Sequence, residues 1–571
     1  MQKTTRPKIT GRRGTIAAGH YLATAAGIRM LAKGGNAVDA GVAAGFALAI
    51  LKPQENSLGG ECPILIYSPA EKKVFAVSGQ GVAPKKATIE WFKNNGITII
   101  PGDGYLGATV SGMFGSYAAA LARFGTLTLN DVLEPAADLA ENGFPVYGAL
   151  SNAINGNAKR YTEEWPSSAD VYMPGGKAPD VGYILKQPAY ANTLKRLAAA
   201  ESENAGKGRV AAIECAAAYF YDKIADDILE FTHSFAVKDA SGNSHTSLLE
   251  KEDFVNYKTR VEEPVSVKYK NCEVFKCGPW NQGPVFLQQL KLLEGFALGQ
   301  MRHNSAEYVH TVIECAKLAF NDRNKYYGDP LFTDVPFDML FSDAYNDGQR
   351  GRIDPSKANN DCLWEPEVVE GAGRHDNDTT HLDAADFSGL LMSATPSGGW
   401  IHSSPVIPKL GFPLGTRGQM FNFLPDHPNN LRPGKRPRTT LTPTIAFKDG
   451  RPWMAFGTPG GDCQDQWALQ FFLNVVDFGM DIDRAVDEPS FHTNHFINSF
   501  YPKNAVVGKV SIEKDVGMDE LIKLQEKGHI LNILNSYTNG QVCAAAVNQL
   551  NGTVEAAASA KGDGQAYAAG W

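Results

Sequence analysis

The tetrapeptide Asp378-Thr379-Thr380-His381 places a hydroxyl nucleophile at an abrupt change of composition, about two thirds of the way along the chain. Residues from about 346 to 378 are almost all charged, Gly, Pro or Asn, and strand-like apolar residues begin at Leu382. If the bond before Thr379 is cut, the freed α-amine, with a pKa near ~8, serves as the base for the adjacent hydroxyl. The same hydroxyl can attack the preceding carbonyl, so the pattern predicts a self-processing, amide-cleaving site. The competing interpretation is the start of a β-strand.

A second chemical motif lies downstream, in Gly457-Thr458-Pro459-Gly460-Gly461-Asp462. Two successive glycines allow two backbone N–H groups to point at one oxygen, as an oxyanion hole requires. We therefore expect Gly460 and Gly461 to stabilise a developing negative charge. A tight turn after a strand is the other interpretation.

The helices and hairpins that must position these motifs follow from apolar spacing and turn residues. In the N-terminal part we expect helices at 21–33 and 36–50, separated by Gly34-Gly35, and a hairpin of strands 63–67 and 74–77. In the middle of the chain, apolar residues at three- and four-residue spacing predict helices at 118–123, 129–142, 192–200, 213–229, 285–298 and 306–327.

The C-terminal third changes to strand pairs. Asp449-Gly450 and Asn551-Gly552 are strong hairpin signals, because the turn needs positive φ. The expected hairpins join 380–384 with 390–394, 444–447 with 453–456, and 542–549 with 553–557, and helices are expected at 465–478 and 519–527. Sheets covered by helices on their outer faces would account for this mixture.

The composition narrows the class of protein. The chain has 571 residues, of which 43% are hydrophobic and 20% charged, as in a large soluble globular protein. A net charge of -8 argues against nucleic acid as a partner. The most apolar run, 37–51, is too short and too Gly-interrupted to span a membrane. No apolar segment follows the basic N-terminus, so we expect a cytoplasmic protein, or a periplasmic or secreted one if a signal was removed.

The eight cysteines are scattered, and the close pair Cys272 and Cys277 matches no zinc motif. We expect buried reduced thiols, no metal and no cofactor. A metal-dependent hydrolase is an alternative whose candidate ligands are His375, Asp376, Asp378, His381, Asp383 and Asp386. Against it, residues after Thr379 alternate between the two faces of a strand.

Taken together, the motifs resemble the gamma-glutamyltranspeptidase family of N-terminal-nucleophile hydrolases over most of the chain. The blocks that carry the resemblance, in family order, are 33–40 (KGGNAVDA), 56–60 (NSLGG), 83–88 (APKKAT), 278–283 (GPWNQG), 327–330 (YGDP), 379–381 (TTH), 435–437 (KRP) and 459–461 (PGG). The resemblance implies an α/β fold, a four-layer αββα sandwich of two stacked, mainly antiparallel sheets with helices on both outer faces.

The resemblance also implies self-cleavage between Asp378 and Thr379, giving a large chain 1–378 and a small chain 379–571 that form one folded body. Thr379 would be the nucleophile and, through its amine, the base. Gly460 and Gly461 would form the oxyanion hole, and Thr439 and Thr440 occupy positions where the family has two serines near the substrate. The processed units could form a homodimer.

Departures from the family pattern concern the substrate. Gln80 aligns with an arginine that holds the glutamyl α-carboxylate, and a neutral amide cannot replace that bidentate pair. Gln419 and Met420 lie where the family has an aspartate for the α-amine, and Ser397-Gly398-Gly399 replaces a family Thr-x-Asn. We therefore expect an amide hydrolase or acyl transferase with altered acyl specificity, acting on a small-molecule amide or peptide-like substrate. Arg417 could bind a different carboxylate, or be a solvated loop arginine.

Two further questions stay open at this level. The segment 397–438, rich in Gly, Pro and Asn, could be a lid over the site or a structural surface loop. The chain could also be an unprocessed, non-catalytic family member that acts as a binding protein.

Overall fold

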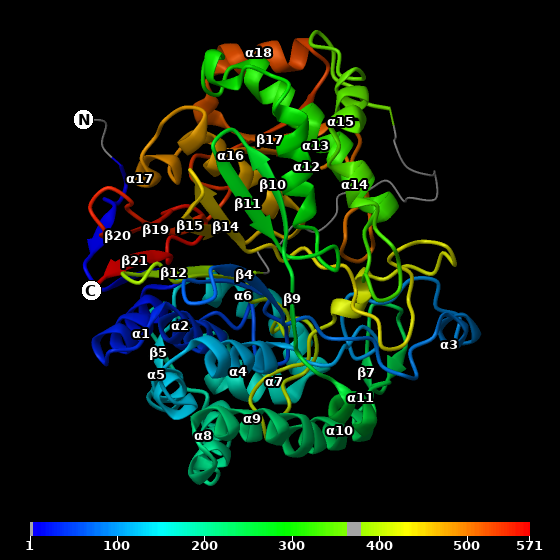
Figure 1. The fold of residues 1–571 in the computed structure, drawn as a ribbon. Helices are drawn as coiled ribbons and strands as arrows, with labels where there is room; N and C mark the ends of the chain where they lie inside the picture. Colours follow the sequence, from blue (N-terminus) through cyan, green and yellow to red (C-terminus); the bar gives the residue numbers. More distant parts are fainter. Residues whose placement is uncertain (1–3, 362–378) are drawn as a thin grey trace.

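The computed structural model describes residues 4–361 and 379–571. Figure 1 shows two stacked β-sheets with helices on both outer faces, which confirms the expected four-layer αββα fold. Each sheet has seven strands. Neighbouring strands within both sheets run antiparallel.

The strand order mixes early and late parts of the chain. In spatial order, the first sheet contains β1 (Ile9–Gly11), β20 (Val554–Ala558), β19 (Cys543–Val547), β15 (Arg451–Gly457), β14 (Thr444–Lys448), β11 (Cys272–Lys276) and β10 (Val265–Tyr269). The second contains β21 (Tyr567–Gly570), β2 (Gly14–Ala18), β12 (Leu382–Asp386), β13 (Leu391–Ala394), β3 (Ile64–Ser68), β4 (Lys73–Ser78) and β9 (Arg260–Glu262).

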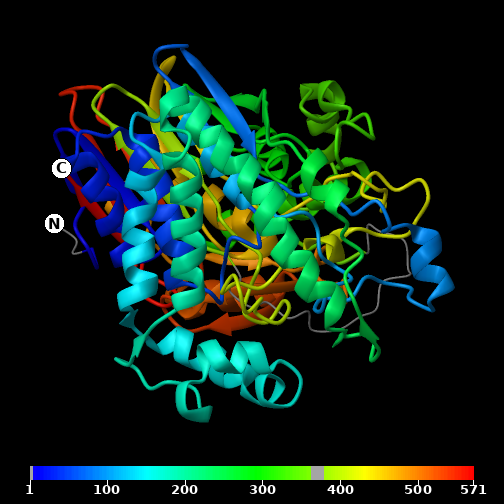
Figure 2. The same cartoon turned by 90° about the horizontal axis from the view of Figure 1, so that it is seen from below.

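Helices bury the outer face of each sheet. Over the second sheet lie α1 (Tyr21–Ala32), α2 (Ala37–Leu51), α4 (Met113–Phe124) and α5 (Leu129–Asn142), with α6 (Gly148–Glu163), α8 (Pro188–Ser202), α9 (Arg209–Tyr219) and α10 (Ala225–Ser234) around them, as Figure 2 shows from below. Over the first lie α12 (Pro284–Leu293), α13 (Ala306–Tyr326) and α16 (Gln464–Val476), and α18 (Met518–Glu526) contacts α13. Small apolar residues such as Ala385, Ala455 and Ala545 fill the layer between the sheets.

Helix α2 begins where the sequence predicts. The Asn36 side chain accepts hydrogen bonds from the N–H groups of Val38 and Asp39, and the Asp39 carboxylate accepts from the Asn36 N–H. This capping box satisfies N–H groups that the helix itself leaves unpaired. Every residue of α2 is buried, so its C-terminal end brings Lys52 into the protein interior.

The predicted hairpins are confirmed, and two further hairpins were missed, β7 (Val237–Lys238) with β8 (Ser244–His245) and β10 with β11. At the β14–β15 turn, Asp449 and Gly450 have φ of 52° and 72°, the geometry that Asp-Gly sequences favour. At the β10–β11 turn, Lys270 adopts a φ of 53°. A lysine carries no turn signal, so the sequence does not reveal this hairpin.

The expected polar linker begins later than predicted. Helix α15 (Asp343–Arg350) covers its first residues, capped by the Ser342 hydroxyl, and buried Asn346 donates to the Leu340 carbonyl at 2.9 Å. The polarity of 346–350 therefore belongs to a capped helix, and that part of the expectation is wrong. Residues 362–378 lie outside the described residues, and with them Cys362, His375, Asp376 and Asp378.

The segment 397–438 packs largely into the interior. Ile401, Val406, Leu410 and Phe412 are buried in the cluster that joins the second sheet to its helices. The surface-loop interpretation is therefore wrong for this stretch. The segment reaches solvent at three short stretches, 408–409, 424–426 and 432–434, and Leu424 is 52% exposed.

Two smaller expectations concern membranes and thiols. Within 4–361 and 379–571, no helix has the length and apolar character needed to cross a membrane. All of the described cysteines except the half-buried Cys215 are buried, as predicted.

Candidate active site

Thr379 lies at the start of the strand path that becomes β12. It forms an isolated antiparallel bridge with Ser397, and the Thr380 N–H donates to the Pro396 carbonyl at 3.1 Å. Because β12 and β13 pair as a hairpin, Ser397 returns to lie opposite Thr379. Thr379 Oγ1 is 3.1 Å from Ser397 Oγ, and both side chains are buried. The hairpin thus supplies the nucleophile candidate with a hydroxyl partner.

Ser397 is held in turn by a buried ion pair. Its backbone exchanges two hydrogen bonds with Glu61, each 2.9 Å long. Arg417 donates from Nη2 to Ser397 Oγ at 2.9 Å and from Nε to the Glu61 carboxylate. Burial raises the pKa of Glu61, and the neighbouring Arg417 charge opposes that shift. Arg417 is therefore a positioning group for Ser397.

Aromatic rings enclose the Arg417 guanidinium. Its carbon lies 4.9 Å from the centre of the Trp400 ring and 5.7 Å from that of Phe500. The side chain is 0% exposed, so the interpretation as a solvated loop arginine is wrong. Its charge is compensated by Glu61, which leaves it poorly suited to hold a substrate carboxylate.

Gly460 and Gly461 follow β15 with φ of 123° and 54°. A Cβ atom on Gly460 would lie 2.1 Å from Trp467 Cζ3, so only glycine fits there. Pro459 and Trp467 line the same small cavity as Thr379. Its volume of about 10 Å³ is close to that of a single water. The structure thus brings the glycine turn and Thr379 to one site.

A buried lysine contacts two carboxylates that line this cavity. Lys52 Nζ is 2.8 Å from Glu55 Oε2 and 2.9 Å from Asp563 Oδ2. Gln541 donates to the other oxygen of Asp563 at 2.6 Å, and Glu55, Gln541 and Asp563 all line the cavity. Sequence reasoning missed this group, because its members are distant in the chain and carry no spacing signal.

Thr439 is connected to the glycine turn through Gln282. The Thr439 N–H donates to the Trp280 carbonyl at 3.1 Å, and the Gln282 N–H donates to the Thr439 carbonyl at 2.8 Å. Gln282 Nε2 also reaches the Asp462 carbonyl at 3.3 Å. The hydroxyls of Thr439 and Thr440 are buried without a hydrogen-bond partner among the described residues.

Gln80 and Gln419 are not brought to Thr379 by any described contact. Gln80 is buried, and its Nε2 donates to the adjacent Gly81 carbonyl at 3.3 Å. Gln419 Nε2 donates to the Gly102 carbonyl at 3.2 Å, and its Oε1 accepts from the Tyr501 N–H at 2.9 Å. Gln419 therefore joins loops, which argues against its expected substrate role.

The segment 497–503 is a part of the site that sequence reasoning missed. The Ser499 N–H donates to Asp462 at 2.8 Å, Phe500 packs on Arg417, and Lys503 Nζ donates to the Met420 carbonyl at 3.2 Å. The segment 497–503 thereby connects Asp462, which follows the glycine turn, to the short helix η5 (Arg417–Met420). No motif marks this stretch in the sequence.

Of the proposed metal ligands, the three that the structure describes have partners within the protein. His381 Nε2 is 2.9 Å from Asp383 Oδ2, and Asp386 accepts from the Ala37 N–H at 2.9 Å. In the described part of the chain, one buried group has the side-chain types for a metal, His310, Glu314 and His529. His310 and Glu314 lie on α13, and His529 follows α18. Glu314 forms an ion pair with Lys317 at 2.7 Å. Neither set favours metal chemistry at Thr379.

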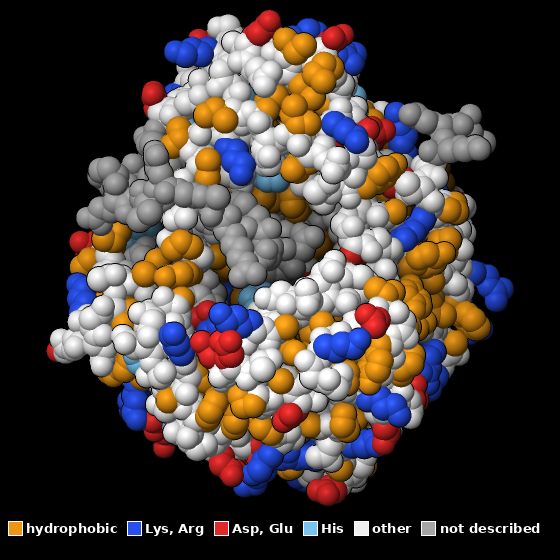
Figure 3. All heavy atoms as spheres, turned by 180° about the vertical axis from the view of Figure 1, so that it is seen from behind, with side chains coloured by type: hydrophobic (Ala, Val, Ile, Leu, Met, Phe, Trp, Pro, Cys, Tyr) orange, Lys and Arg blue, Asp and Glu red, His pale blue; other side chains and the backbone are white. Residues whose placement is uncertain are grey.

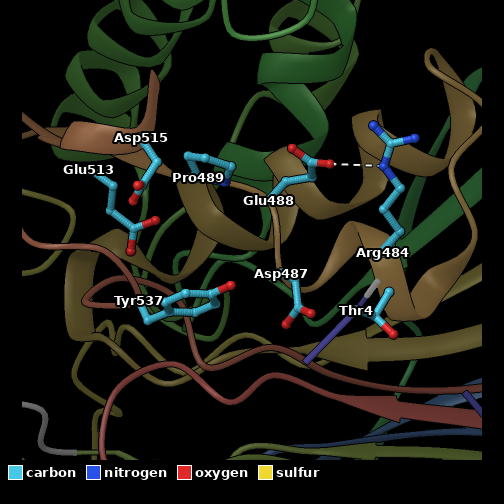
Figure 4. A pocket seen from close by; sticks show the side chains of 8 residues that line it. All are labelled: Thr4, Arg484, Asp487, Glu488, Pro489, Glu513, Asp515 and Tyr537. Carbon is cyan, nitrogen blue, oxygen red and sulfur yellow. Dashed lines mark hydrogen bonds and ion pairs between the residues drawn. The ribbon is translucent and has the colours of Figure 1, made fainter. Parts of the chain in front are cut away.

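A larger pocket, of about 240 Å³, lies elsewhere, and four of its eight lining residues are acidic, as Figure 4 shows. Thr5 donates from its N–H to Asp487 Oδ2 there at 2.7 Å. None of the predicted site residues lines it. On the face in Figure 3, a hollow lies near the centre, and Lys and Arg side chains are interspersed with Asp and Glu.

Comparisons with known proteins point to one family. The sequence model of the gamma-glutamyltranspeptidase family matches residues 23–569. The glutathione hydrolase-like YwrD proenzyme of Bacillus subtilis (strain 168) is 31% identical over 98% of this chain and 99% of its own length. The solved structure of LmbA2991HD is 40% identical, with a TM-score of 0.94 over 100% of both chains. Cephalosporin acylase from Bacillus halodurans is 26% identical, with a TM-score of 0.84 over 100% of this chain and 98% of that one.

Proposed function

We propose, from the premise that the chain belongs to the gamma-glutamyltranspeptidase family, that it is a self-processing amide hydrolase or acyl transferase with Thr379 as nucleophile. The observation that carries this proposal is the 3.1 Å separation of Thr379 Oγ1 and Ser397 Oγ in a buried site that Pro459 also lines. Family membership makes the chain an enzyme of the N-terminal-nucleophile hydrolase type.

Self-processing uses the same hydroxyl as later turnover. Thr379 Oγ1 attacks the carbonyl carbon of Asp378, the C–N bond breaks, and the hydroxyl proton passes to the leaving nitrogen. Water then hydrolyses the resulting ester, which frees a carboxylate on Asp378 and an α-amine on Thr379. Arg417 donates to Ser397 Oγ, and the same hydroxyl lies 3.1 Å from Thr379 Oγ1, where it can orient the nucleophile.

In turnover, the freed α-amine takes the proton of the Thr379 hydroxyl, which attacks the substrate amide. The amine product leaves with that proton, and water or another amine then takes the acyl group. Backbone N–H groups of Gly460 and Gly461 stabilise the oxyanion. Thr439 and Thr440 bind the substrate beside them.

The two products of cleavage would stay together because both sheets mix their strands. β12, from the 379–571 segment, pairs with β2 from the 1–378 segment, with Leu382 opposite Ala18. In the other sheet β14 pairs with β11 in the same way. Separating the chains would break both ladders, which supports one folded body of two chains.

The acyl group is not expected to be gamma-glutamyl. Gln80 cannot form the charged clamp that its aligned arginine provides, and Met420 offers no carboxylate for an α-amine. The similarity to a protein named cephalosporin acylase supports amide cleavage on a different acyl group.

A denaturing gel tests this proposal. Purified wild-type protein is expected to give two fragments, cut at Asp378–Thr379, and Thr379→Ala a single full-length band. Thr380→Ala is the matched control, because its buried hydroxyl has no described partner, and it should still be cut. A wild-type band that stays full-length after long incubation contradicts self-processing.

A further inference from the structure

A buried group of metal-binding side chains lies where α13 meets the turn after α18, at one end of the molecule (Figure 1). His310, Glu314 and His529 are 1%, 3% and 4% exposed. One nitrogen of each ring and one carboxylate oxygen lie within 4.8 Å of one another. None of the three residues lines the cavity at Thr379 or the larger pocket, so the group is separate from the candidate active site.

Two distant parts of the chain bring these side chains together. His310 and Glu314 are four residues apart on α13, which places their side chains on one face of the helix. His529 reaches them from the turn between α18 and β18 (Ile530–Leu534), and its Nε2 lies 2.8 Å from His310 Nδ1. Three potential ligand atoms therefore converge inside the protein.

A backbone carbonyl fixes the orientation of His310. Its Nε2 lies 2.9 Å from the Asp354 carbonyl, which can only accept, so the proton is on Nε2. Burial lowers the pKa of His310 and lowers that of His529 to about 3, so both rings are neutral near pH ~7. His310 Nδ1 therefore presents a lone pair to the group. Histidines that bind metals are held in this way, with the other ring N–H on a carbonyl or carboxylate.

His529 can turn a lone pair to the same point without losing another hydrogen bond. Between two neutral rings, His529 Nε2 donates to His310 Nδ1. His529 Nδ1 is buried and has no hydrogen-bond partner among residues 4–361 and 379–571. The ring proton can therefore move to Nδ1, which leaves Nε2 available to a metal ion.

The Glu314 carboxylate is held in place but not saturated. Lys317 Nζ donates to Oε1 at 2.7 Å, and the Asn359 N–H donates to Oε2 at 3.2 Å. Each carboxylate oxygen has a further lone pair, so these contacts orient Glu314 without blocking it. Lys317 is also the cation with which a metal ion would share this carboxylate.

Other histidine–carboxylate pairs lack the third ligand. His245 pairs with Asp239 at 2.8 Å, and His381 pairs with Asp383 at 2.9 Å. Neither pair belongs to a group of three metal-binding side chains in the part of the chain that the structure describes. The convergence at His310, Glu314 and His529 is thus more than a histidine–carboxylate contact.

We infer that His310, Glu314 and His529 bind one structural Zn²⁺ ion. Two imidazoles and a carboxylate form a donor set found in zinc sites, whereas Mg²⁺ and Ca²⁺ are bound through oxygen atoms. Water or the second oxygen of Glu314 completes the coordination.

The ion joins the two segments on either side of the Asp378–Thr379 bond. His310 and Glu314 belong to 1–378, and His529 belongs to 379–571. Residues 354–361 pack at the same place, since the Ala358 N–H donates to the Lys527 carbonyl at 2.7 Å. The ion therefore stabilises the contact between α13, residues 354–361 and the 527–529 turn, whether or not the chain is cut.

Zinc content and zinc affinity test the site. Tag-free wild-type protein purified without chelator should contain about one Zn²⁺ per chain by plasma mass spectrometry. After dialysis against EDTA, titration calorimetry with ZnCl₂ should show a single tight site. His529→Gln and Glu314→Gln should each weaken Zn²⁺ binding about 100-fold or more, because each removes a ligand.

Matched variants separate the loss of a ligand from damage to the fold. His245→Gln removes a histidine that is paired with Asp239 outside the group, and it should bind Zn²⁺ like the wild type. Lys317→Met removes the competing cation and should bind Zn²⁺ at least as tightly. Zn²⁺ should raise the thermal midpoint of the wild type and His245→Gln but not that of His529→Gln. If His529→Gln does not fold, Glu314→Gln and Lys317→Met carry the test.

The affinity of the EDTA-treated proteins decides between the outcomes. Wild-type protein that binds Zn²⁺ no more tightly than His529→Gln and Glu314→Gln overturns the site, and any zinc it carries is then held elsewhere. Weaker binding by Lys317→Met contradicts the role of Glu314 as a ligand that Lys317 shares. These measurements use neither an amide substrate nor the cleavage reaction, so the site stands or falls independently of the proposed function.

Discussion

Arg417 donates from Nη2 to Ser397 Oγ at 2.9 Å, so the hydroxyl beside Thr379 is oriented by a buried cation. The same guanidinium binds Glu61, whose backbone pairs with that of Ser397. Glu61, Arg417 and Ser397 thus form a connected series of buried groups that ends at the Thr379 hydroxyl. The α-amine that the family mechanism uses as base exists only after cleavage. In the uncut chain, we therefore expect this series to position the Thr379 hydroxyl.

Ser397→Ala should slow both self-cleavage and amide turnover. It removes the hydrogen bond between the Ser397 and Thr379 hydroxyls, a loss of about 1 kcal/mol or more, and therefore roughly tenfold in rate. Band densities on a time course of denaturing gels measure the first effect. Ser388→Ala, which removes the hydroxyl of an exposed turn residue bonded to Asp386, is the control. Unchanged processing in Ser397→Ala would show that Ser397 has no positioning role.

Glu61→Ala should destabilise the fold by about 3–5 kcal/mol, because it leaves the buried Arg417 charge without its partner. Glu71→Ala is a matched comparison, since Glu71 forms a surface pair with Arg123 at 2.9 Å with side chains 45% and 42% exposed. Such pairs contribute about 0–1 kcal/mol. Urea unfolding of both variants measures the difference, and equal losses would contradict the assigned role of the Glu61–Arg417 pair.

Gly460→Ala should abolish processing while Gly434→Ala should not. A Cβ on Gly460 meets the Trp467 ring at 2.1 Å, so the glycine turn has to move. Gly434 also has positive φ, 74°, but no heavy atom lies within 4 Å of its would-be Cβ. Both substitutions introduce backbone strain of about 1–3 kcal/mol, but only Gly460→Ala also displaces the glycine turn. Comparing the two variants therefore distinguishes the effect of displacement from that of strain. Normal cleavage in Gly460→Ala would show that processing does not depend on the glycine turn.

Lys503 should give the protein a measurable pH dependence. Its pKa is about 7 in the folded chain and ~10.4 when unfolded, so between these values the unfolded chain binds the extra proton. The stability of the wild type should therefore rise, relative to Lys503→Met, as pH increases from 7 towards 10. The groups facing Lys503 are the Arg438 cation, the Met420 and Phe421 carbonyls, and His427, whose pKa burial lowers to about 3.

Urea midpoints of the two proteins at several pH values between 6 and 9.5 provide this measurement. The advantage of Lys503→Met should be largest at pH 6 and should shrink above pH 7. A difference that does not vary with pH would show that Lys503 has an ordinary pKa.

The sequence predicts the helices and hairpins well where periodicity or turn residues are strong, as at α2 and at the Asp449–Gly450 turn. It fails where the fold overrides local signals. The Lys270 turn has no turn chemistry, and the polar run at 346–350 is a helix because Ser342 caps it.

For the candidate site, short sequence motifs predict Thr379, Gly460 and Thr439 as members. The Glu61–Arg417 pair and Lys503 have no such pattern, since each owes its role to segments far apart in the chain. Gln419 shows the converse. Its position in the family pattern predicts a substrate-binding role, but its amide group forms hydrogen bonds with Gly102 and Tyr501 instead.

The most direct test of the central claim is intact mass spectrometry, with N-terminal sequencing, of the purified wild-type protein. The account predicts two chains, 1–378 and 379–571, with the smaller one beginning at a free Thr379 amine, and one uncut chain for Thr379→Ala. A single wild-type mass of the whole chain, or a small fragment that begins at any other residue, would contradict it.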